Sequence, residues 1–163
     1  MSKLFVDDIV EKTSGHLVRI PGHVIQCVHT STTTGQTSTS SSFVDMTNMT
    51  LNITPKATNS LIFISAAIAF AAQRSGTIDI HASTQLLRDS TVISGKDLRT
   101  YDYGVGGIYI NAEIGYSFVD QPATTSAITY KFQMRKVAAN TSAASMNAES
   151  GSRSSIVIME IAQ

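Results

Sequence analysis

The stretch AITYKFQMRKV, residues 127–137, decides the fold class. Ile128, Tyr130, Phe132 and Met134 alternate in it with polar side chains. This period of two is typical of a β-strand that packs one face and exposes the other to water. Because the same signal recurs along most of the chain, the sequence predicts an all-β protein.

Two further segments are apolar on both faces. Residues 61–73 are expected to form a strand sandwiched between two packed surfaces, and residues 155–162 a strand in the middle of a sheet. A buried helix remains the alternative for 61–73, since a short apolar run does not settle the period. The remaining strands are expected at 23–29, 43–46, 49–53, 78–87, 91–93, 108–119 and, as a short edge strand, 144–147.

Turn residues separate the expected strands. Residues 88–90 predict a hairpin turn, residues 120–122 a second turn, and Gly115 a bulge or bend within its strand. Eleven of the thirteen residues in 30–42 are Ser or Thr, which favours an exposed loop. Eight to ten strands without a convincing amphipathic helix predict a jelly-roll-like antiparallel β-sandwich.

The first 22 residues differ from the rest of the chain. They show no long hydrophobic period and end in Ile20-Pro21-Gly22, a sequence that favours a turn. We therefore expect an N-terminal arm over 1–22 and a β-sandwich head over 23–163. An extended arm that pairs with a neighbouring subunit is favoured, and a short helix over 6–12 is the alternative.

Composition excludes several partners. Twelve basic and twelve acidic residues cancel, so no electrostatic footprint for nucleic acid or an anionic membrane is expected. The longest apolar run, 61–72, is too short for a membrane-spanning helix, and no secretory signal pattern is present. The sequence predicts a protein made in a cytoplasm.

No catalytic motif is found. His23 and His29 share a predicted strand face but lie about 20 Å apart at strand rise, too far to bind one metal within a chain. A histidine on a three-fold axis remains open as an ion ligand. Asp79 and His81 are interpreted as a surface hydrogen-bonded pair, and Cys27, the only cysteine, as a small buried apolar residue. We expect no enzyme activity, catalytic residue, cofactor or metal.

One segment combines flat apolar rings with directional polar groups. Arg99, Tyr101, Asp102 and Tyr103, in a stretch that continues to Gly107, are the candidate recognition loop for a glycan or a loop of another protein. The alternative is that these tyrosines pack on their own sandwich or at a subunit seam.

Four segments carry a family resemblance: LFVDDIVEKTSGHLVRIPGHVIQCV (4–28), LLRDSTVI (86–93), FVDQPATTSAITYKFQM (118–134) and SRSSIVIMEIA (152–162). Together they resemble a β-rich module of virion structural proteins of tailed bacteriophages, especially cyanophages, in which it often forms the globular end of a fibre. The resemblance implies a homotrimer with a jelly-roll-like head, made in the host bacterial cytoplasm and attached to the virion surface through its N-terminal segment.

No shaft of repeats precedes the module in this sequence. We therefore expect a capsid decoration or cement protein whose partners are itself and the major capsid protein. A tail-fibre or head-fibre knob that binds a host surface glycan is the alternative. Contact with the virion or a neighbouring subunit is expected through apolar side chains of the arm, namely Leu4, Val6, Ile9, Leu17 and Ile20.

Overall fold

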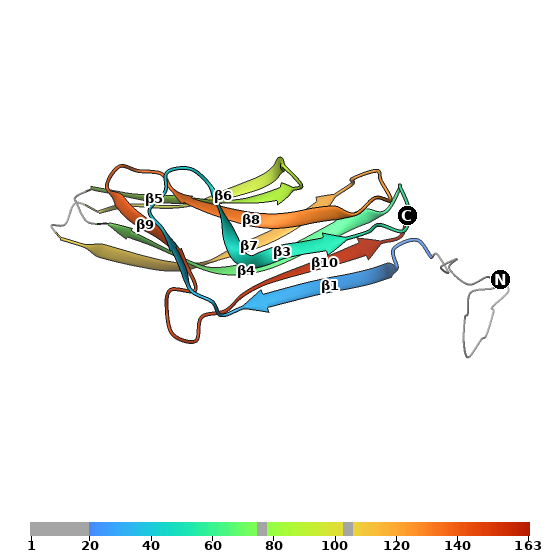
Figure 1. Ribbon diagram of the computed structural model, residues 1–163, viewed down its shortest axis with the longest axis horizontal. Helices are drawn as coiled ribbons and strands as arrows, with labels where there is room; N and C mark the ends of the chain where they lie inside the picture. Colours follow the sequence, from blue (N-terminus) through green and yellow to red (C-terminus); the bar gives the residue numbers. More distant parts are fainter. Residues whose placement is uncertain (1–19, 75–77, 103–105) are drawn as a thin grey trace, which may run out of the picture.

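A computed structural model describes residues 20–74, 78–102 and 106–163. These residues form strands and no helix, which confirms the all-β prediction and rules out a helix at 61–73. The strands lie in two facing layers (Figure 1). The arm over 1–19, including Leu4, Val6, Ile9 and Leu17, lies outside the described residues.

Six strands make up one layer, here called sheet A. They are β1 (Val24–Thr32), β2 (Gln36–Ser38), β4 (Leu61–Arg74), β7 (Ile108–Asp120), β9 (Thr141–Met146) and β10 (Ser154–Ile161). The long strand β4 is the spine of this sheet. β7 follows one edge of β4, whereas β10 and then β9 follow the other edge. β1 pairs with β10, and β2 pairs with β9.

Four strands make up the second layer, sheet B. They are β3 (Val44–Ile53), β5 (Ile78–Arg88), β6 (Thr91–Asp102) and β8 (Ile128–Lys136), in the order β3-β8-β5-β6. All pairings in both sheets are antiparallel. Setting aside the short insertions β2 and β9, the remaining eight strands form two four-stranded sheets, β1-β10-β4-β7 and β3-β8-β5-β6, which is jelly-roll topology.

The core lies between the inner faces of the two sheets. Every second side chain of β4 and β8 points into it, and Ile64, Phe70, Tyr130 and Phe132 are almost completely buried. Tyr116 of β7 meets Phe132 edge-on at 4.8 Å between ring centroids. Full burial of one large apolar side chain contributes about 1.5–3 kcal/mol. The alternation predicted for 127–137 is therefore confirmed, because the apolar side chains of this strand point into the core.

The two buried tyrosine hydroxyls have partners. The Tyr116 hydroxyl lies 2.7 Å from the Thr84 hydroxyl on the opposite sheet. Tyr130 donates to Oδ2 of Asp120 at 2.6 Å, and Arg88 Nη1 donates to both Asp120 oxygens at 2.9 and 3.0 Å. Asp120 belongs to sheet A and its two partners to sheet B, so these bonds join the layers.

Alkaline pH is expected to destabilise this fold. Burial raises the pKa of Tyr116 to about 12 and also raises the pKa of Tyr130, whose hydroxyl donates to the Asp120 carboxylate. In the unfolded chain both tyrosines ionise near pH 10, so their full contribution to stability is present below that pH. The free energy of unfolding should fall by about 1.4 kcal/mol per pH unit per tyrosine as pH rises from about 10 to about 12. Denaturant titrations across this range measure the slope. Tyr116→Phe should make it shallower, and an unchanged slope would refute the assignment.

Some element boundaries differ from the sequence expectations. Part of the loop expected at 30–42 is strand, because β1 runs to Thr32 and Gln36–Ser38 forms β2. The strands expected at 43–46 and 49–53 are one strand, β3, with a register shift near Asn48, whose φ is +61°. Gly115 pairs in unbroken register with Ala67, so the expected bulge is absent there.

Two other boundaries also change. β9 lies between β4 and β2 and is not an edge strand. Residues 94–102, which were expected beyond the end of a short strand, continue β6. β9 is placed by backbone pairing with β2 and β4, which are distant in sequence, whereas residues 94–102 extend the hairpin pairing of β6 with β5. Apolar alternation reveals neither pairing.

The described chain begins in a turn that contacts its last strand. His23 N donates to Ile20 O at 2.9 Å, with Pro21 and Gly22 between them. Gly22 has φ +84°, which suits the third position of a type II turn. Gly22 N also donates to Ala162 O at 2.9 Å. The turn predicted at 20–22 is confirmed, and it holds the two ends of the described chain together.

Candidate functional site

The outer face of sheet A carries little charge. On the strands of this sheet, Arg74, Asp120 and Glu160 point to the inner side, and only Glu113 lies on the outer side. Glu160 is fully buried and accepts hydrogen bonds from Lys56 N at 2.7 Å and Gln26 Nε2 at 2.6 Å. The sheet therefore keeps its charges inside, within hydrogen-bonded networks, and presents a nearly neutral surface.

Apolar side chains gather at one end of this outer face. Cys27, Met159, Phe63 and Val119 stand side by side across β1, β10, β4 and β7, as the strand registers show. We call the following set the apolar rows: Val24, Cys27, Leu61, Phe63, Val119, Val157, Met159 and Ile161. Val24 and Val119, at its two sides, are each 52 % exposed.

Small residues follow the apolar rows along the same face. Ser31, Ser155, Ala67 and Gly115 form a row across the four strands. A Cβ added to Gly115 would meet no atom within 4 Å, so this part of the face is open. Next to the apolar rows, the outer face therefore carries small, uncharged residues.

The apolar outer face explains a difference from the sequence interpretation. The segment 61–73 was expected between two packed surfaces, but sheet B covers only the inner face of β4. Leu61 and Phe63 on the other face are half-buried, with no second layer over them among the described residues. Cys27, expected to be buried, is exposed on the same face. Its inward neighbour Val28 packs on the core instead.

The outer face of sheet B has the opposite character. Lys131 Nζ lies 3.0 Å from Asp45 Oδ2, and Arg99 Nη2 lies 3.3 Å from Asp79 Oδ2. Asp79 thus pairs with Arg99 and not with His81 as the sequence suggested. The charged residues on this face are Asp45, Asp79, Asp97, Arg99, Lys131 and Arg135. Four of these charges form two ion pairs on the same face, which suits a surface that stays in water.

Two carboxylates on sheet B are held in their ionised form. A hydrogen bond from Gln133 is the main cause that lowers the pKa of Asp45. A hydrogen bond from the Ser83 hydroxyl at 2.5 Å likewise lowers the pKa of Asp97, with a smaller effect from His81 at 3.4 Å. These carboxylates accept hydrogen bonds on an open strand surface, and neither is poised to take up a proton near neutral pH.

The candidate recognition residues lie partly on this polar face. The Arg99 guanidinium carbon is 4.7 Å from the centroid of the Tyr101 ring, and Tyr101 is 55 % exposed. Both belong to β6 and not to a loop. Tyr103 and the side chain of Asp102 lie outside the described residues. The structure therefore brings together Arg99 and Tyr101, on a strand.

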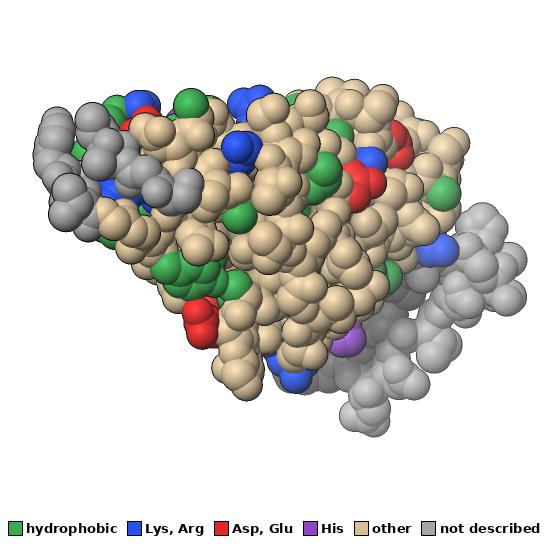
Figure 2. Space-filling view, turned by 60° about the vertical axis from the view of Figure 1, so that its left-hand side comes forward, with side chains coloured by type: hydrophobic (Ala, Val, Ile, Leu, Met, Phe, Trp, Pro, Cys, Tyr) green, Lys and Arg blue, Asp and Glu red, His purple; other side chains and the backbone are tan. Residues whose placement is uncertain are grey.

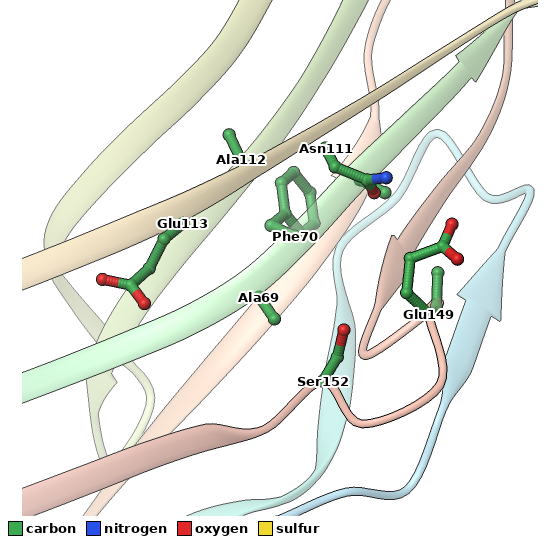
Figure 3. Close-up of a pocket in the computed structure, with 9 residues that line it drawn as sticks. Ala69, Phe70, Asn111, Ala112, Glu113, Glu149 and Ser152 are labelled. Atoms are coloured by element: carbon green, nitrogen blue, oxygen red, sulfur yellow. The ribbon is translucent and has the colours of Figure 1, made fainter.

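A hollow of about 290 Å³ lies at the other end of the outer face of sheet A. Figure 3 shows Glu113 on β7 and Glu149 on the β9–β10 loop at opposite sides of it, with Ala69 between them. Its other lining residues are Phe70, Ala71, Asn111, Ala112, Ala148 and Ser152. These residues come from three distant segments of the chain and share no motif, so the sequence alone gives no signal for the hollow.

The loop beside the hollow is firmly anchored. Asn147 is buried, and its backbone N donates to Ala69 O at 2.9 Å. The Ser154 hydroxyl accepts from Ala69 N at 3.1 Å and donates to Asn147 Oδ1 at 2.8 Å. These bonds give the backbone N–H and C=O groups of Ala69 their partners, at the point where the neighbour of β4 changes from β10 to β9. The hollow is a by-product of that change of partner.

The described residues hold neither a metal-binding group nor a membrane-spanning helix. No group of three or more His, Cys, Asp or Glu side chains able to hold a metal ion occurs within 20–74, 78–102 and 106–163. In the same ranges no helix is long and apolar enough to cross a membrane. Figure 2 shows one face of the molecule, where uncharged polar side chains and backbone predominate and charged side chains are scattered.

Comparisons with known proteins give only remote likenesses. No protein-family model and no curated protein sequence matches the chain. Among solved structures, it is similar to infectious bursal disease virus VP2 in a subviral particle, with 16 % identity and a TM-score of 0.42. A structure of the Gx strain of that virus gives 13 % identity and a TM-score of 0.42. These matches cover 95 % of this chain but only 37 % and 38 % of the other chains.

Proposed function

We propose that this chain is a non-enzymatic structural protein of a bacteriophage virion, a homotrimer that decorates or cements the capsid surface. The outer face of sheet A is the observation that carries the proposal. It is nearly uncharged, carries the apolar rows at one end and is uncovered within the described residues. A soluble monomer rarely leaves a contiguous apolar patch in water, so such a face favours a contact with another protein.

Assembly explains the rest of the surface better than catalysis does. The pKa shifts of Asp45 and Asp97 accompany hydrogen bonds on an open sheet, and both pKa values are lowered. A general acid or base working near neutral pH needs a pKa closer to that pH. The resemblance of four sequence segments to virion modules supplies the biological setting. Partners would be further copies of this chain and the major capsid protein.

Binding to particles tests this function directly. Purified protein should bind capsids that lack it and should sediment as a trimer at micromolar concentration. Removing residues 1–19 should abolish capsid binding and leave the circular dichroism spectrum unchanged, because the described fold begins at residue 20. A protein that sediments as a monomer and ignores capsids would disprove the proposal.

A receptor-binding knob is the second candidate. The exposed Tyr101 ring with Arg99 stacked on it supports this function, since such a pair suits contact with a glycan. Decoration remains preferred, because these residues stand on a flat strand and the hollow lies on the other sheet. Host-cell binding in the absence of capsid binding would favour the knob.

Tyr101→Ala tests the knob at residue level. If β6 contacts a host glycan, the variant should bind host cells about tenfold more weakly, the effect expected when one aromatic anchor is lost. Tyr109→Ala is the matched control, because Tyr109 is 40 % exposed and lies on sheet A, next to the hollow. Equal host-cell binding by the wild type and both variants would show that neither β6 nor the rim of the hollow is a recognition site.

A further inference from the structure

We infer that the apolar rows are the contact between copies of this chain, with the β1–β10 half of one copy packed on the β4–β7 half of the next. This inference rests on the proposed function and names the partner of that face. Both halves are apolar: Val24, Cys27 and Met159 lie on one, and Leu61, Phe63 and Val119 on the other.

Charge complementarity identifies the partner as a second copy. No formal charge lies among the apolar rows, so a partner must bring an equally uncharged apolar area, or it would bury charges without compensation. Every copy of the chain presents such an area on sheet A. The outer face of sheet B does not match it, because it carries six charged side chains, including the Lys131–Asp45 and Arg99–Asp79 ion pairs.

The two sides of the apolar rows are more exposed than their middle. Val24 and Val119, the outermost members of the rows, are each 52 % exposed, while Leu61, Phe63 and Met159 between them are half-buried. Around a three-fold axis, the β1 side of one face would meet the β7 side of the neighbouring face. This head-to-tail contact closes after three copies, and the rows of all copies converge on the axis.

Charge placed on the rows tests the inference. Val119→Asp should convert the trimer to a monomer at micromolar concentration in analytical ultracentrifugation, because assembly would bury an unpaired carboxylate. Val92→Asp is the matched control, since Val92 is 53 % exposed on β6 of the other sheet, and this variant should remain trimeric. Circular dichroism should confirm that both variants fold, as both positions are exposed. Val119→Ser supplies a milder variant, and a fully trimeric Val119→Asp protein would overturn the inference.

The single cysteine provides a second readout. Cys27 is exposed in the isolated chain, so its burial between copies should slow maleimide labelling about tenfold relative to the Val119→Asp variant. A Val119→Cys variant should form disulfides between copies on oxidation, giving covalent dimers and trimers. Within one copy these positions are three strand spacings apart, about 14 Å, too far for a disulfide. Cys27–Cys27 dimers of the wild type would instead show a two-fold contact and refute the head-to-tail arrangement.

The outcomes separate this inference from the proposed function. If Val119→Asp stays trimeric but no longer binds capsids, the apolar rows face the capsid, so the inference fails and the virion role stands. If Val119→Asp becomes monomeric and its capsid binding weakens through lost avidity, both stand. If the wild type is a monomer with fast Cys27 labelling and no capsid binding, both fail.

Discussion

Removing residues 156–163 should abolish folding. These residues form nearly all of β10, which pairs with β1 on one side and β4 on the other. Ile156 and Ile158 are completely buried, and Glu160 anchors the loop before β4 through Lys56. Loss of two buried isoleucines alone costs about 4–10 kcal/mol at 2–5 kcal/mol each, which reaches the whole stability of a typical domain.

Circular dichroism and thermal unfolding measure this effect. The truncated chain should show no cooperative transition, because β1 would lose its only strand partner in sheet A. Removal of the exposed Gln163 alone is the control and should leave the transition within a few degrees of the wild type. A cooperative transition and a β-rich spectrum in the truncated chain would contradict the central place of β10.

Asp120→Ala should lower the free energy of unfolding by about 3 kcal/mol, because it leaves the buried Tyr130 hydroxyl and the Arg88 guanidinium without their shared acceptor. The carboxylate also joins the two sheets, so its loss weakens the contact between layers. Urea titration with a two-state fit measures this change in the free energy of unfolding.

Asp45→Ala is the matched control for this substitution. Asp45 also accepts bonds from a cation and a neutral side chain, Lys131 and Gln133, but its side chain is 55 % exposed. A pair that water screens contributes at most about 1 kcal/mol. The comparison isolates the effect of burial, and equal losses in the two variants would show that burial at Asp120 is not the cause.

Strands with apolar alternation could be predicted from the sequence, and those built from Ser and Thr could not. β8 shows the period of two directly, whereas β4 and β10 could be predicted as strands from runs that are apolar on both faces. β2 has no apolar pattern and forms because its backbone pairs with β9, aided by a 3.0 Å contact between the Thr37 and Ser145 hydroxyls. That pairing joins residues more than a hundred positions apart, which no local window contains.

The surface was less predictable than the core. Cys27 is exposed although a small apolar residue of its type is expected inside, because residue type alone cannot say which face of a strand is inside. Asp120 was interpreted as a turn residue, whereas it ends β7 and binds two side chains of the other sheet. The apolar rows come from four strands, so their continuity depends on registers that only the fold reveals.

The bond between Gly22 and Ala162 bears on protein engineering. It places residue 20 beside the C-terminus, so a short linker from Gln163 to Ile20 could close the described chain into a ring (Figure 1). A circular permutant opened between Asp89 and Ser90, in the tight β5–β6 hairpin, would keep every strand intact. For the same reason, a peptide fused after Gln163 would emerge beside residue 20, where the described chain begins.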